Sequence, residues 1–235
     1  LSNYHLVYRT ETEEKSFLLA DLSAVVFESP MISVTLALFN ELQANGVIVL
    51  LCDSRKFPSA MLMPLFGTAD AFQKSEAQFS WIKEQRDGAW RQIMFFFFSN
   101  QSALLKEKGI GFPVPKVNDG DPENVEGIYA GQYFRSLFGR GFRRHLQDDI
   151  NAALNYGYTV LLSAMARVIA SHGYLLQCGI HHKGANNPYN FACDLVEPFR
   201  PIVDACVSSR GGKLDKEYKL SLISCLQKTV SYDQR

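Results

Sequence analysis

The sequence has no net charge and no long apolar run, and each absence excludes a class of protein. Its 24 Lys and Arg residues equal its 24 Asp and Glu residues, and it is 47% apolar and 20% charged. That composition excludes a disordered, collagen-like or coiled-coil chain. The longest uncharged stretch, residues 150–166, has 17 positions and includes polar ones, whereas a membrane-spanning helix needs about 20 predominantly apolar residues. We therefore predict a globular chain with no membrane segment.

Paired cysteines are also missing. The five cysteines are odd in number and form no Cys-x-x-Cys motif, so a disulfide framework is not expected, and a reducing cytoplasm fits this usage. At the N-terminus no basic segment leads into an apolar run and a cleavage site, and the chain opens on Leu1 rather than on methionine. We expect no secretory leader and a trimmed start.

The residues that are present divide the chain into two parts. Its 235 residues suffice for one large domain or two modest ones. Up to Pro64 the apolar residues come in short blocks, which is typical of strands, and the spacing of residues 32–42 predicts one helix that ends at Asn45-Gly46. After residue 67 the spacing becomes helical. We therefore predict an α+β fold with a β-rich N-terminal domain over residues 1–68, a linker over 69–75 and a helical domain over 76–235.

Start signals locate the helices of the second part. Asp121-Pro122-Glu123 offers an N-cap, a proline at the first helical position and an acid in the first turn. A long, mostly buried helix is expected to begin at Asp148 or Asp149. Asn187-Pro188 begins the last strong helix, which Pro198 is expected to kink or end.

Two carboxylates three residues apart, Asp194 and Glu197, are predicted on one face of that last helix. Apolar residues flank both of them, and an acid in such surroundings needs a cationic partner. Either Arg200 or a metal ion would supply the positive charge. A solvated acidic face is the common alternative for such a pair.

Three further residues are candidates for metal ligation. His181 and His182 lie in a glycine-flanked loop just before this helix, and neutral imidazole is the commonest metal ligand in proteins. Glu126 lies in an earlier helix among apolar residues. A surface or capping role is the ordinary alternative for each of the three.

Zinc is the competing metal, because three cysteines lie near this loop in the sequence. The spacings of Cys178, Cys193 and Cys206 match no compact zinc pattern. Carboxylates with one imidazole suit magnesium or manganese better, the hard ions used when phosphate is the partner.

The densest positive cluster falls within 11 residues and is interleaved with three phenylalanines. It consists of Arg135, Arg140, Arg143, Arg144 and His145. Residues 126–235 carry 13 basic against 9 acidic residues, so a polyanion would bind in this part of the chain. The cluster is either a solvated cationic face or a set of contacts to nucleic-acid phosphates.

Taken together, these motifs resemble the CRISPR-associated spacer-acquisition integrase, the universal Cas endonuclease of the adaptation module. The similarity extends over most of the chain. Segments 151–158 and 60–64 resemble further parts of the family and favour its type II branch. The most specific match is a Gly-x-x-His loop followed by a Glu-Pro-Phe-Arg-Pro helix, in the segment Gly179 to His182, then Asn187, Phe191, Ala192, Asp194, Glu197 to Pro201 and Asp204.

The resemblance implies a β-rich domain and a helical catalytic domain. It also implies one divalent ion, Mg²⁺ or Mn²⁺, held by Glu126, His182 and Glu197, with Asp194 and Arg200 in supporting roles. The implied activity inserts short foreign DNA fragments into a CRISPR repeat array by attack of a 3′ hydroxyl on a phosphodiester. The implied partners are double-stranded DNA, a second copy of the chain and a small subunit that bridges two dimers.

Two other functions remain open on the sequence. A non-catalytic DNA-binding scaffold would pair its acids with Arg200 and Lys183, and it would need no metal. A hydrolase of small phosphoesters would turn over such substrates without preferring DNA.

Overall fold

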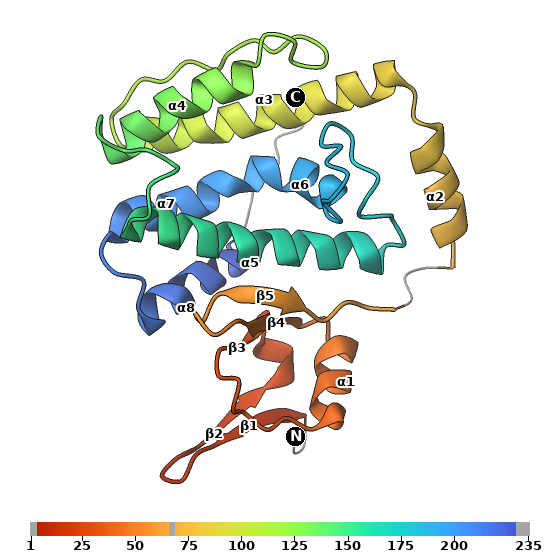
Figure 1. Cartoon of the computed structure of the whole chain (residues 1–235), viewed down its shortest axis with the longest axis vertical. Coiled ribbons are helices and arrows are strands. Elements are labelled where there is room, and N and C mark those ends of the chain that lie inside the picture. Colours follow the sequence, from red (N-terminus) through yellow and green to blue (C-terminus); the bar gives the residue numbers. More distant parts are fainter. Residues whose placement is uncertain (1–3, 66–68, 229–235) are drawn as a thin grey trace. The chain divides into compact units, whose positions relative to one another are not determined.

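The computed structural model describes residues 4–65 and 69–228 and divides into two compact units (Figure 1). The first holds residues 1–65 and 226–235, and the second holds residues 66–225. The predicted domain end at residue 68 lies outside the described residues. The predicted linker over 69–75 is partly helical, since a helix begins at Ala71. Residues 226–228 also differ from the prediction, because they belong to the first unit, where the Gln227 side chain donates to Ser23 Oγ at 3.3 Å.

The first unit contains two small sheets. Strands β1 (His5–Arg9) and β2 (Glu14–Leu18) form an antiparallel hairpin. Strand β4 (Ile48–Cys52) is the middle strand of the other sheet, parallel to β3 (Ala24–Phe27) and antiparallel to β5 (Pro58–Met61). The apolar blocks of the sequence thus form strands, as their rhythm predicts.

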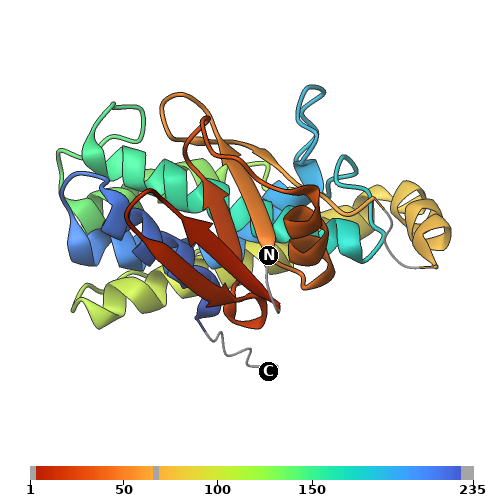
Figure 2. The same ribbon diagram turned by 90° about the horizontal axis from the view of Figure 1, so that it is seen from below.

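Helix α1 (Leu36–Ala44) packs against β4 in the first unit (Figure 2). It begins later than the apolar spacing from Ile32 suggests, because Thr35 caps it and accepts the N–H of Leu38 on its hydroxyl. Gly46, with a φ of 73°, follows the helix in the left-handed conformation. The buried core of this unit consists of Leu19, Leu38, Leu42, Val47 and Val49.

The regular elements described in the second unit are all helices, which confirms the predicted fold class. Its α-helices are α2 (Ala71–Ser80), α3 (Lys83–Glu107), α4 (Val125–Phe138), α5 (Asp149–Ser171), α6 (Asn190–Val196), α7 (Arg200–Arg210) and α8 (Lys216–Ser224). The short 3₁₀ turn η2 (Glu197–Phe199) connects α6 to α7, and η3 (Cys225–Gln227) follows α8. Figure 1 shows α3 beside α4, and α5 is packed against α6, α7 and α8.

The start of α4 differs from the prediction. Asp121-Pro122-Glu123 precedes the helix, and Asn124 is the N-cap, with a left-handed φ of 51° and a side chain that accepts the N–H of Gly127. Asp121 still serves the helix, because its carboxylate accepts the N–H groups of Val125 and Glu126. The helix is therefore capped from two positions, and its first turn carries Glu126.

The predicted start of α5 agrees with the structure, whereas α6 begins at Asn190, after the Asn187-Pro188 pair that was expected to start it. Asp148 caps α5 and accepts the N–H of Asn151 at 2.7 Å. The last predicted helix is interrupted at Pro198, which lies in η2 between α6 and α7. Within residues 4–65 and 69–228, no helix combines the length and the apolar character needed to cross a bilayer.

Candidate active site

Asp194 on α6 organises the loop that carries the two histidines. Its carboxylate is completely buried and accepts the backbone N–H groups of Ile180, His181 and His182. It also accepts Nδ1 of His182 at 2.7 Å. A buried carboxylate is tolerated when donors saturate it in this way, so the alternative of a solvated acidic face does not describe Asp194.

Gly179 makes this arrangement possible. A Cβ atom at this position would lie 2.3 Å from the carbonyl oxygen of His182 and 2.9 Å from Oδ2 of Asp194. Only glycine lets the backbone approach this closely. The first residue of the Gly-x-x-His motif therefore has a steric role, and the sequence carries no direct signal for it.

The two histidines have different surroundings. The His181 ring stacks on Trp90 of α3, with ring centroids 4.2 Å apart and an angle of 5° between the planes. The His182 ring donates Nδ1–H to Asp194, which fixes the tautomer and leaves Nε2 as a lone-pair donor. The hydrogen bond to Asp194 raises the pKa of His182 against the opposing effect of burial. His182 therefore presents a ring nitrogen that a metal ion could bind, and Trp90 is a contact of the loop that the sequence pattern does not indicate.

Glu197 at the start of η2 is a buried acid that is only partly satisfied. Its side chain is 1% exposed, and Oε1 lies 2.9 Å from the Arg200 guanidinium. Its second oxygen, Oε2, is buried without a hydrogen-bond partner among the described residues. Burial raises the pKa of Glu197 to about 7, although Arg200 opposes the shift. A buried carboxylate oxygen without a donor is a position that a cation would stabilise.

Glu126 lies half-buried in the first turn of α4. Its carboxylate charge acts on both His182 and Glu197 and raises the pKa of each. The three proposed ligands, drawn from α4, the histidine loop and η2, are therefore electrostatic neighbours. In the described part of the chain, however, no three His, Cys, Asp or Glu side chains are already gathered as a metal-binding cluster.

The donor types of these residues fit a hard divalent ion. Two carboxylates and one imidazole suit Mg²⁺ or Mn²⁺, and the unpaired Oε2 of Glu197 supplies a free ligand atom. The three cysteines near this loop in the sequence, Cys178, Cys193 and Cys206, are free thiols. Among the described residues none of them joins a cluster of metal-ligating side chains.

The arginine cluster divides into exposed and engaged members. Arg135 and Arg140 are exposed and line a surface hollow with Gln132 and Ser136. Arg143 is exposed and donates to the carbonyl groups of Arg140 and Phe142.

Arg144 is already engaged within the chain. Its terminal nitrogens donate to Asn151 at 2.5 Å and to Asn155 at 2.8 Å, both on α5. Arg135 and Arg140 are therefore better placed than Arg144 to contact a polyanion.

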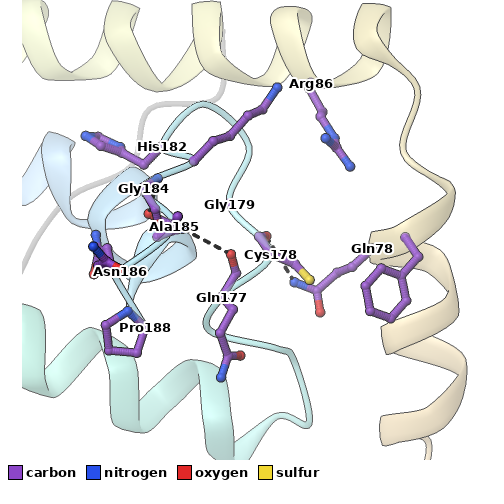
Figure 3. Close-up of a pocket in the computed structure, with 14 residues that line it drawn as sticks. Gln78, Arg86, Gln177, Cys178, Gly179, His182, Gly184, Ala185, Asn186 and Pro188 are labelled. Carbon is purple, nitrogen blue, oxygen red and sulfur yellow. Dashed lines mark hydrogen bonds between the residues drawn. The ribbon is translucent and has the colours of Figure 1, made fainter.

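A polar hollow opens beside His182 (Figure 3). Arg86 reaches it from α3, and Lys183 and the loop through Pro188 form another part of its lining. The Nε atom of Arg86 is buried without a partner among the described residues. No sequence pattern indicates Arg86, because a lone arginine in a helix is ordinarily a solvated residue.

The fold is that of the Cas1 proteins. A CAS1 protein from Thermotoga maritima, TM1797, matches 95% of this chain and 84% of its own with a TM-score of 0.72 and 14% identity. A casposase bound to integration product matches 98% of this chain and 80% of its own, with a TM-score of 0.77 and 22% identity. Both likenesses concern the fold.

The sequence comparisons lead to the family. The model of the family "CRISPR associated protein Cas1" matches residues 124–216. The CRISPR-associated endonuclease Cas1 of Neisseria meningitidis is 29% identical over 99% of this chain and 79% of its own length. These matches confirm the resemblance carried by the sequence, and the matched residues 124–216 include Glu126, His182 and Glu197.

Proposed function

We propose that this chain is a divalent-metal-dependent DNA endonuclease and integrase, which joins short DNA fragments to the ends of a CRISPR repeat through a DNA 3′ hydroxyl. The relative from Neisseria meningitidis is named an endonuclease, and a protein of the same fold is described bound to an integration product. Both names support a reaction at DNA phosphodiesters.

One observation carries the proposal most directly. Glu197 keeps a buried oxygen unpaired while the neighbouring carboxylate of Glu126 adds further negative charge. Two carboxylates whose negative charges act on each other in this way are stabilised by a cation. When bound, a divalent ion would polarise the scissile phosphate and lower the pKa of the attacking hydroxyl.

The chain's own residues would perform the positioning. Glu126, His182 and Glu197 would hold the ion, with His182 using Nε2 because Asp194 occupies Nδ1. Arg200 holds Oε1 of Glu197 and thereby directs Oε2 away from itself. Because the three ligands are not gathered in advance, the ion would draw them together and add stability to the folded chain.

The DNA would lie along the exposed arginines within residues 124–216. Arg135, Arg140 and Arg143 would contact backbone phosphates, with Arg144 in a more internal position. From the family resemblance we further propose double-stranded DNA as the substrate, a homodimer as the working form, a small bridging subunit as the partner and the bacterial cytoplasm as the compartment.

The scaffold hypothesis has one observation in its favour, the ion pair between Glu197 and Arg200. Its other expected pair is replaced, since Asp194 contacts His182. A scaffold would bind DNA equally well with and without a chelator, whereas a hydrolase of small phosphoesters would turn over a chromogenic phosphodiester without a preference for DNA.

Integration of a labelled fragment into a supercoiled repeat plasmid with Mn²⁺ separates these functions. We expect strand transfer by the wild-type chain and its loss in Glu126→Gln, His182→Ala and Glu197→Gln. Glu217→Gln is the matched control, because this α8 side chain is 85% exposed. Full activity in Glu126→Gln or His182→Ala would remove that residue from the mechanism. DNA binding that is unaffected by chelator, without strand transfer in any variant, would favour the scaffold.

A further inference from the structure

A buried hydrogen bond connects α4, which carries Glu126, to α7, which follows Glu197. Tyr133 on α4 donates its hydroxyl to Oδ2 of Asp204 on α7 at 2.8 Å, and both side chains are almost fully buried. Tyr133 comes seven residues after Glu126, and Asp204 comes seven residues after Glu197. Seven residues are about two helical turns, so the bond ties the two ligand-bearing segments at matching distances from their ligands.

The same carboxylate reaches a third helix. Its other oxygen, Oδ1, accepts the hydroxyl of Tyr158 on α5. Asp204 is 1% exposed, and burial raises its pKa although both phenols stabilise the charge. One acid thus joins α4, α5 and α7 through two phenol hydroxyls.

Tyr158 extends this connection to Glu197. The Arg200 guanidinium lies over the Tyr158 ring, 5.1 Å from its centroid, and its Nη2 contacts Oε1 of Glu197 at 2.9 Å. The Nε atom of Arg200 is buried without a partner among the described residues. The ring face and the carboxylate are therefore the contacts that orient this guanidinium.

We propose that Asp204, Tyr133 and Tyr158 are positioning residues for the two carboxylate ligands. Tyr133 sets the place of α4 and with it Glu126, and Tyr158 sets Arg200 and with it the free oxygen of Glu197. This inference rests on the proposed function, because it concerns the same metal ligands. A buried acid is costly compared with apolar packing. One of its bonds leads to α4, which carries Glu126, and the other leads through Tyr158 to Arg200, which contacts Glu197.

The test compares Mn²⁺ affinity with stability in single-hydroxyl variants. Tyr133→Phe and Tyr158→Phe each remove one bond to Asp204 while the ring stays. Tyr218→Phe is the matched control, since this buried phenol donates to the carbonyl of Val207 and has no contact with Asp204. Mn²⁺ binding is followed by electron paramagnetic resonance of the free ion, and the melting temperature is measured without metal.

We expect each Asp204-linked variant to bind Mn²⁺ about 10-fold more weakly, and the control to stay within about twofold of the wild type whatever its melting temperature. Asp204→Asn, which can accept only one of the two phenols, should give a comparable loss. Wild-type affinity in both tyrosine variants, or an equal loss in Tyr218→Phe, would overturn the inference. The proposed function itself fails if the wild-type chain does not bind Mn²⁺, or if Glu126→Gln binds Mn²⁺ as tightly as the wild type does.

Discussion

His182 Nδ1 lies 2.7 Å from Oδ1 of Asp194, and this carboxylate also accepts three backbone N–H groups of the loop. One buried acid therefore sets both the course of the loop and the direction of the imidazole. Neither residue would hold this position without the other, because the loop carries the histidine and the acid shapes the loop.

Asp194→Asn should weaken Mn²⁺ binding although the side chain keeps nearly the same size. The amide cannot accept all four donors, so His182 loses its anchor, and Mn²⁺ affinity should fall by about 10- to 100-fold. The pKa of His182, raised by Asp194 in the wild type, should drop in the variant. Nuclear magnetic resonance titration of the imidazole and Mn²⁺ binding measure the two effects.

Asp215→Asn is the control for that substitution. Asp215 caps α8 and accepts the N–H of Tyr218, and asparagine caps a helix about as well as aspartate does, so this substitution removes one carboxylate charge without touching the histidine loop. An unchanged His182 pKa in Asp194→Asn would contradict the hydrogen bond that this account places at the centre of the loop.

Gly179→Ala should disrupt the loop by a steric clash. Its Cβ atom would lie 2.3 Å from the His182 carbonyl oxygen, and backbone cannot yield as a flexible side chain does. We expect a loss of about 3 kcal/mol in unfolding free energy together with loss of Mn²⁺ binding. Gly141→Ala is the control, since its Cβ would have no neighbour within 4 Å. Urea denaturation checks both, and a fully stable Gly179→Ala would refute the close approach.

The fold and the site differ in how far the sequence predicts them. Periodicity places strands and helices because a strand or a helix buries one face at a fixed spacing, as Leu38 and Leu42 do on α1. Helix α4 begins later than the sequence predicts because Asn124 takes a left-handed conformation. That conformation depends on the surrounding contacts rather than on a residue pattern.

Site contacts between distant segments depend on packing. The stacking of Trp90 on His181 and the bond between Tyr133 and Asp204 join residues far apart in the chain. No local spacing encodes these contacts. The motif around Glu197 could be found because its members are close in sequence.

Stability should depend on pH through Asp204. Burial raises its pKa from 3.8 to about 6, so between these values the folded state binds a proton that the unfolded chain has released. The unfolding free energy should therefore fall as the pH rises through this window. The contribution is about 2 kcal/mol across this window. Urea denaturation of the wild type and of Asp204→Asn isolates it, and parallel pH profiles would show that the shift is absent.

Arg135 and Arg140 should contribute to DNA affinity through counterion release. Replacing both with glutamine should reduce the slope of log affinity against log salt by about 2, since each phosphate contact adds about 0.9. Fluorescence anisotropy with a DNA duplex over a range of salt concentrations measures the slope. Arg55→Gln is the control, because Arg55 is an 84% exposed arginine of the first unit. An equal slope change in the control would assign the effect to net charge alone.

The central claim is that one divalent ion is coordinated by Glu126, His182 and Glu197. A crystal soaked in Mn²⁺ and measured for anomalous scattering at the manganese edge tests it most directly. The account predicts one peak bonded to Oε2 of Glu197, Nε2 of His182 and the Glu126 carboxylate, absent in crystals of Glu126→Gln. A peak bonded to other residues, or no peak beside Glu197 and His182, would contradict it.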